Sequence, residues 1–70
     1  MLARPAYAGR VIRYRFEFIG DGPLPRPDNV LRDAPIVVGT LELYGAVRYL
    51  VEGVDENANP PIAVLRRVRS

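Results

Sequence analysis

The segment Val11–Ile19 constrains the fold of this chain more than any other stretch. Apolar or aromatic side chains occupy every second position, at Ile12, Tyr14, Phe16 and Phe18, and most of the positions between them are charged. Because successive side chains of a strand point to opposite faces, this alternation predicts a half-buried β-strand and not a helix. The core is therefore expected on the face that carries the aromatic rings.

Several later segments also have the composition of strands. Ile36–Tyr44 is rich in β-branched residues and alternates at its end, and Ala46–Glu52 alternates from its start. Since Gly45 lies between them, the two runs predict a hairpin that turns at this glycine. Val30–Leu31 predicts a brief strand or a turn. Ile62–Arg69 predicts the last strand. Because apolar residues occupy both odd and even positions at its start, the alternation does not decide which of its faces points inward.

Glycine and proline mark the connections between these segments. Residues 20–29 contain two glycines and three alternating prolines, which predict a long loop that is partly extended. Asp55–Pro61 predicts a turn, and Gly39 predicts a bulge or a close backbone crossing inside its strand. Residues 1–9 are expected to form an irregular N-terminal arm.

Four or five strands without any lasting helical period predict a single all-β domain over residues 1–70. The expected fold is a small antiparallel barrel or curled sheet of four to five strands. A first strand, a long loop, a meander around Gly45 and a short return strand resemble the layout of the SH3-like small barrels. The resemblance covers most of the chain and implies that the first and last strands lie side by side.

The size of the chain predicts that one copy has a small core. A chain of 70 residues buries only about 60% of its unfolded surface, so folding is marginal without further support. The sequence has no cysteine for a disulfide and no histidine for a zinc site of the usual kind. We therefore expect a homo-oligomer. No apolar run is long enough for a membrane helix and no signal peptide is recognisable, so the expected location is cytoplasmic.

The chemistry available to the chain argues against an enzyme. It has no histidine, cysteine or lysine, and its hydroxyl nucleophiles are Thr40 and Ser70 apart from the tyrosines. Asp55–Asn59 matches the opening of a calcium loop, but Pro60 and Arg66 occupy the positions that need glycine and glutamate. We expect no catalytic residues, no cofactor and no metal.

The charge layout is the most informative functional feature. All ten basic residues are arginines, and basic ends flank an acidic middle over residues 36–60. If the first and last strands are neighbours, four arginines form a candidate phosphate-binding surface: Arg13, Arg15, Arg67 and Arg69. A solvated outer face explains the same residues without any ligand. A third interpretation pairs the basic strands of one copy with the acidic hairpin of another.

Together these observations favour a non-enzymatic interaction or accessory module that associates with itself or with another protein. The alternative is weak, salt-sensitive nucleic-acid binding through the four arginines. Pro23–Pro27 also has the composition of a polyproline ligand, but its prolines are two apart where such a ligand has them three apart, so a stiff connecting loop is the preferred interpretation.

Overall fold

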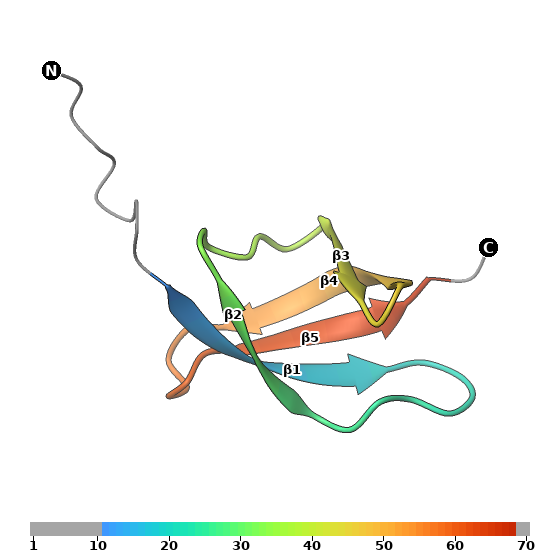
Figure 1. The fold of residues 1–70 in the computed structure, drawn as a ribbon. Coiled ribbons are helices and arrows are strands. Elements are labelled where there is room, and N and C mark those ends of the chain that lie inside the picture. The colour runs from blue at the N-terminus through green and yellow to red at the C-terminus, as the bar shows by residue number, and fades with distance from the viewer. Residues whose placement is uncertain (1–10, 69–70) are drawn as a thin grey trace, which may run out of the picture.

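A computed structural model describes residues 11–68 and shows a single five-stranded sheet (Figure 1). The strands are β1 (Ile12–Ile19), β2 (Asp28–Arg32), β3 (Leu41–Tyr44), β4 (Val47–Asp55) and β5 (Ile62–Arg67). Their order across the sheet is β2-β1-β5-β4-β3, and the sheet is curled into a half-barrel. The expected arm 1–9 lies outside the described residues. Within residues 11–68 there is no helix, and therefore none that could cross a membrane.

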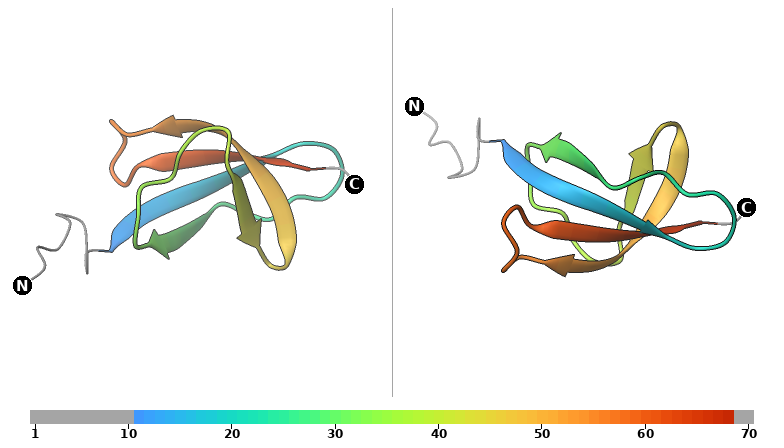
Figure 2. Two further views of the ribbon diagram at one scale, coloured as in Figure 1. Left: turned by 90° about the horizontal axis from the view of Figure 1, so that it is seen from above. Right: turned by 90° about the horizontal axis from the view of Figure 1, so that it is seen from below.

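The pairing of the strands makes the sheet mixed. The pairs β1–β2, β3–β4 and β4–β5 are antiparallel, but β1 and β5 run parallel, with Arg15 opposite Ile62. The loop over residues 33–40 crosses the open side of the sheet, as Figure 2 shows from above, and carries the chain to the far edge. The last strand therefore returns beside β1 in the same direction. The all-β curled sheet is confirmed, a purely antiparallel one is not, and the SH3-like layout stays a prediction.

The aromatic face of β1 forms the core, as the alternation predicts. Phe16 is completely buried, and Tyr14 is nearly so. The other buried residues lie on β4, on β5 and in the loop before β3. They are Tyr49 and Val51 of β4, Ala63 and Leu65 of β5, and Ile36 of the loop. The inward face of β5, which the sequence left open, is thus the one that carries Ala63 and Leu65.

The hairpin between β3 and β4 turns where the sequence predicts. Tyr44 pairs with Val47, which leaves Gly45 and Ala46 as a two-residue loop. Both loop residues have positive φ, 59° and 65°, which is typical of the type I′ turn that matches strand twist. Further along β4, a bulge between Val51 and Gly53 shifts the register against β5, a feature that the alternation did not predict.

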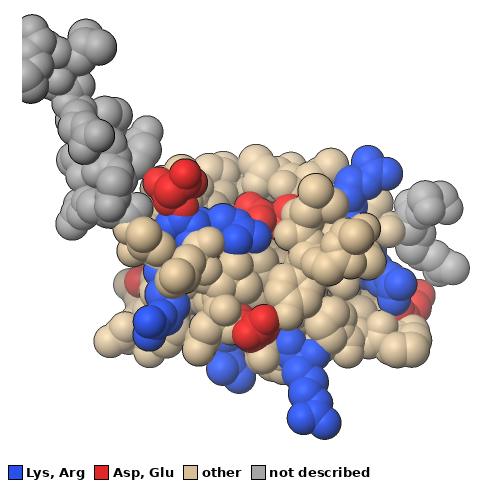
Figure 3. All heavy atoms as spheres, viewed as in Figure 1, with Lys and Arg blue, Asp and Glu red and all other residues tan. Residues whose placement is uncertain are grey.

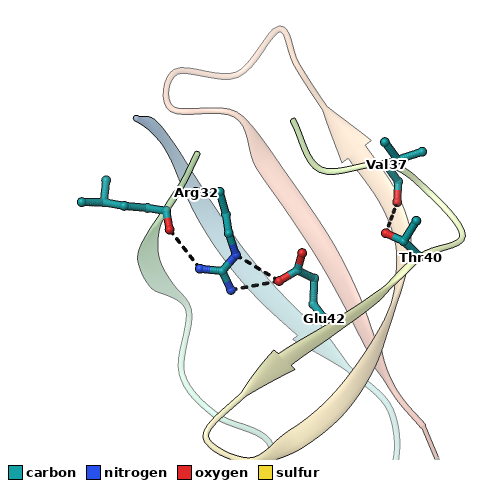
Figure 4. Close-up of polar contacts among 5 residues, drawn as sticks. Arg32, Val37, Thr40 and Glu42 are labelled. Carbon is teal, nitrogen blue, oxygen red and sulfur yellow. Dashed lines mark hydrogen bonds and ion pairs between the residues drawn. The ribbon is translucent and has the colours of Figure 1, made fainter. Parts of the chain in front are cut away.

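The predicted strand Ile36–Tyr44 is wrong over its first half. The backbone N–H of Ile36 donates to the Tyr14 hydroxyl at 3.0 Å, and the Ile36 side chain is buried, so the loop itself contributes to the core. The chain then turns at Val38–Gly39, where the Thr40 hydroxyl donates to the Val37 carbonyl at 2.6 Å (Figure 4).

Gly39, with a φ of 93°, belongs both to this turn and to a β-bulge. Its N–H donates to the Val51 carbonyl at 2.8 Å, and the Val51 N–H donates to the Thr40 carbonyl at 2.9 Å, so two residues oppose Val51 of β4. The predicted bulge at Gly39 is therefore confirmed. The brief strand at Val30–Leu31 is also confirmed, within β2.

Candidate interaction surface

The two edge strands of the sheet, β2 and β3, are bridged by an ion pair. Arg32 on β2 donates from Nε and from Nη2 to Oε1 of Glu42 on β3, at 3.1 and 2.9 Å (Figure 4). The Arg32 guanidinium also lies over the Phe16 ring, 5.2 Å from its centroid. Both charged side chains are less than one third exposed. Side chains, and not a backbone ladder, therefore connect the two edges of the half-barrel.

A second contact bridges the same two strands. The Tyr44 hydroxyl on β3 donates to Oδ2 of Asp28 on β2 at 2.6 Å. This hydrogen bond raises the pKa of Tyr44 above its ordinary value, and loss of solvent and the negative charge of Asp28 act in the same direction. The Tyr44 ring also packs against Phe18, with ring centroids 5.0 Å apart. The bridge thus joins the polar edges to the aromatic core.

The outward side of these edge strands is apolar. Because side chains alternate along a strand, the inward turn of Arg32 and Glu42 places Leu31, Leu41 and Leu43 on the outside. These leucines and two valines of the connecting loop are each between 55% and 63% exposed, and we call the set the apolar seam: Leu31, Val37, Val38, Leu41 and Leu43. Figure 3 shows uncharged atoms over most of the upper edge, where Figure 1 places the loop and β3.

Within residues 11–68, each edge strand has one side without a strand neighbour, since β2 pairs with β1 and β3 pairs with β4. In the half-barrel these two free sides are connected by the side chains of Arg32 and Glu42. On β3 the outward-facing residues are both leucine, because Glu42 is turned inward to Arg32. The outer face of β3 is therefore apolar, whereas its free edge is occupied by the bridge to β2.

The arginines proposed from the sequence are not gathered on one surface. Arg13 and Arg15 are exposed on the outer face of β1, where Arg15 Nε lies 3.3 Å from Glu17 Oε2. Arg15 is level with Ile62, so Arg67 stands five residues further along β5, roughly 16 Å away. Arg67 also pairs with Tyr49, which points inward. Arg69 lies outside the described residues.

The parallel register of β1 and β5 is the reason for this separation. Side chains on neighbouring strands form one surface only where they lie level with each other and on the same face of the sheet. Arg67 is not level with Arg13 or Arg15, and its side chain starts from the opposite face. Nucleic-acid binding through these residues stays a prediction, and the described part of the chain provides no continuous basic track for it.

The acidic middle of the chain is partly neutralised within the molecule. Glu42 is bound to Arg32, and Glu52 on β4 accepts hydrogen bonds from Arg66 on β5, one of them 2.9 Å long. The Arg66 hydrogen bonds lower the pKa of Glu52 below its ordinary value, against an opposing effect of desolvation, and the positive charge of Arg66 adds to the lowering. The hypothesis that the basic strands of one copy bind the acidic hairpin of another needs these carboxylates. Glu42 and Glu52, however, already have arginine partners within the same molecule.

A different group of arginines, which the prediction from the sequence missed, lies at the end of the sheet. Arg48, Arg66 and Arg67 line one open pocket of about 840 Å³ together with the loop Gly20–Gly22. The group depends on β4 and β5 meeting in a particular register, because Arg48 lies opposite Val68. No local pattern in the sequence contains this information.

The remaining candidates offer little chemistry. Within residues 11–68, no group of three or more acidic, histidine or cysteine side chains is placed to hold a metal ion. In the proline-rich loop, Leu24 is half-buried and Arg26 is exposed. Comparisons with protein-family models, with curated proteins and with solved structures found no significant match. The geometry of the chain itself is therefore the basis for any functional assignment.

Proposed function

We propose that this protein is a non-enzymatic interaction module that associates with a second copy of itself through the apolar seam. The observation that carries the proposal is the exposure of Leu31, Leu41 and Leu43 on the outer faces of two edge strands. Exposed apolar patches on a small monomer are typical of interaction sites.

A second copy is the occupant that fits this surface best. In a twofold dimer each copy presents the same patch, so the outer face of β3 in one copy packs against that of the other and brings Leu41 and Leu43 of both copies together. Such a contact buries the apolar seam of two molecules at once, without any other partner.

The small core of one copy supports the same proposal. Only seven hydrophobic residues among those described are buried, and a domain of this size is marginally stable on its own core. Burial of five further aliphatic side chains removes apolar area from water, which contributes about 25 cal/mol per Å² before the cost of association. Because the seam carries no charge, we expect association to resist high salt.

The proposal is tested by placing a charge on the seam. Leu43→Glu adds a carboxylate at a position that is 63% exposed, so we expect the fold to tolerate it. In a dimer, however, the same change places two carboxylates in an apolar interface, where they are strongly unfavourable. Sedimentation velocity should show a dimer for the unmodified protein and a monomer for Leu43→Glu at equal concentration.

The matched control is Asn57→Glu, which adds the same charge at an exposed residue of the turn between β4 and β5, outside the seam. We expect this variant to remain dimeric. Equal dissociation of both variants would show that the added charge alone is responsible. A dimer that survives Leu43→Glu would refute the seam as the interface.

A further inference from the structure

A second surface lies where β5 ends and β4 begins, and it borders the seam because Arg48 is the cross-strand neighbour of Leu43. Its pocket is lined by Arg48 of β4, by Arg66 and Arg67 of β5, and by the loop Gly20–Gly22 that follows β1. Ala46, Val47 and Val68 also line it. Three of the seven arginines of residues 11–68 thus line one hollow.

Arg48 is the arginine of this pocket that is free to bind a ligand. Within residues 11–68, its side chain makes no hydrogen bond or ion pair, and it is exposed. Its backbone is fixed, because its carbonyl accepts from the Val68 N–H at 3.3 Å. Among the described residues, the Arg48 guanidinium therefore has no partner, while its backbone is fixed by the hydrogen bond between β4 and Val68.

Arg67 is held in place by the loop that forms the other wall. Its Nη1 donates to the Pro23 carbonyl at 3.1 Å, which leaves the other guanidinium N–H groups available. The backbone of Gly20 comes so close that a Cβ there would lie 3.4 Å from the Arg67 Cβ. Gly20 also has a φ of 133°, which only glycine adopts readily. The loop is thus shaped around the Arg67 side chain.

Two acids reduce the positive charge of the pocket but do not cancel it. Glu52 occupies Nε and Nη2 of Arg66, and Asp21 lies in the pocket wall and adds to the raised pKa of Arg66. Three guanidinium groups against these two carboxylates leave one net positive charge. A compact anion is therefore attracted, and a long polyanion gains little.

We infer that this pocket binds the phosphate group of a small phosphate monoester. Guanidinium groups match phosphate oxygens in geometry and charge, and Arg48 and Arg67 supply forks from two different strands. A single-stranded nucleic acid needs aromatic rings for stacking and a basic groove along its backbone. Among the described residues the lining contains no aromatic side chain. Arg15 is level with Ile62 at the opposite end of the β1–β5 register, and Arg13 lies two residues further from the pocket.

The test is a titration with a phosphate monoester, phenyl phosphate, followed by amide and arginine Nε chemical shifts at constant ionic strength. Benzenesulfonate, inorganic phosphate and chloride serve as comparison anions. We expect saturable shifts at Gly20, Gly22 and Arg48 with phenyl phosphate and with inorganic phosphate, and none with chloride. Arg48→Gln removes one charge-assisted contact and should weaken binding about tenfold.

Arg13→Gln is the matched control, since Arg13 is an exposed arginine of the same sheet outside the pocket. It should bind phenyl phosphate with unchanged affinity. Equal weakening by both variants, or shifts no larger than those with chloride, would overturn the inference. So would a short oligonucleotide that binds more tightly than phenyl phosphate and loses affinity equally with Arg13→Gln and Arg48→Gln.

Discussion

Arg32 and Glu42 form an ion pair across the open side of the half-barrel, with Arg32 Nη2 2.9 Å from Glu42 Oε1. The two residues belong to β2 and β3, which stand at opposite edges of the sheet order. The pair therefore brings the two edges together without a backbone ladder. It also turns both polar side chains inward, which leaves leucines on the outside of both strands.

Removal of Glu42 should lower the stability of the fold. In Glu42→Ala the half-buried Arg32 loses both of its hydrogen bonds to this carboxylate, and we expect the free energy of unfolding to fall by about 1–3 kcal/mol. Urea denaturation measures this change. The matched control is Glu17→Ala, which breaks the exposed pair with Arg15 and should cost less than about 0.5 kcal/mol. Equal losses in the two variants would show that closure of the barrel does not depend on the bridge.

Truncation of Phe16 should prevent folding. Its ring is completely buried and contacts the rings of Phe18 and Tyr44, with centroids 6.2 Å away in each case. Phe16→Ala leaves a large cavity and is expected to cost about 3–5 kcal/mol, which is comparable to the whole stability of so small a domain. Circular dichroism and amide chemical-shift dispersion report the loss. A folded Phe16→Ala protein would contradict the assignment of this ring to the centre of the core.

Both positions of the hairpin turn should favour glycine, so Gly45→Ala and Ala46→Gly should change stability in opposite directions. Gly45→Ala places a side chain at φ 59°, and since nothing lies within 4 Å of the added Cβ, the cost is conformational, about 1 kcal/mol. Ala46→Gly removes the same strain at φ 65° and should raise the midpoint of thermal unfolding. If both substitutions change the midpoint in the same direction, the type I′ assignment fails.

The pairing of Glu52 with Arg66 should appear in its titration. The Arg66 hydrogen bonds lower the pKa of Glu52 below the ordinary value of 4.5. Because the folded-state pKa is depressed, the pair stabilises the fold above that value, and the contribution disappears as the pH falls through the folded-state pKa. Carboxyl carbon shifts of Glu52 measure the pKa directly. Arg66→Gln should return it toward the ordinary value, and an unchanged pKa in this variant would exclude Arg66 as the cause.

The local features of the fold were predictable because they depend on nearby residues. The alternation in β1 identified Tyr14 and Phe16 as core residues, since facing follows directly from strand geometry. Gly45 marked the hairpin, because a two-residue turn needs positive φ. The glycines and prolines of residues 20–27 likewise excluded regular structure there.

The missed features depend on contacts between distant segments. Ile36 has the composition of a strand residue but is drawn out of the sheet by the buried Tyr14 hydroxyl, 22 positions earlier in the chain. The parallel pairing of β1 with β5 follows from the path of the loop 33–40 and separates Arg67 from Arg15. The seam and the arginine pocket likewise arise only when register is fixed, so the sequence could suggest self-association but not its residues.

The central claim, self-association through an apolar surface, is tested most directly by the mass of the unmodified protein. The measurement is light scattering after size exclusion, at low and at high salt, with and without a short mixed-sequence oligonucleotide. We expect a dimer whose mass is the same at both salt concentrations and does not change with the oligonucleotide. A monomer at every concentration, shifted only by the oligonucleotide and only at low salt, would contradict the proposal and favour the nucleic-acid alternative.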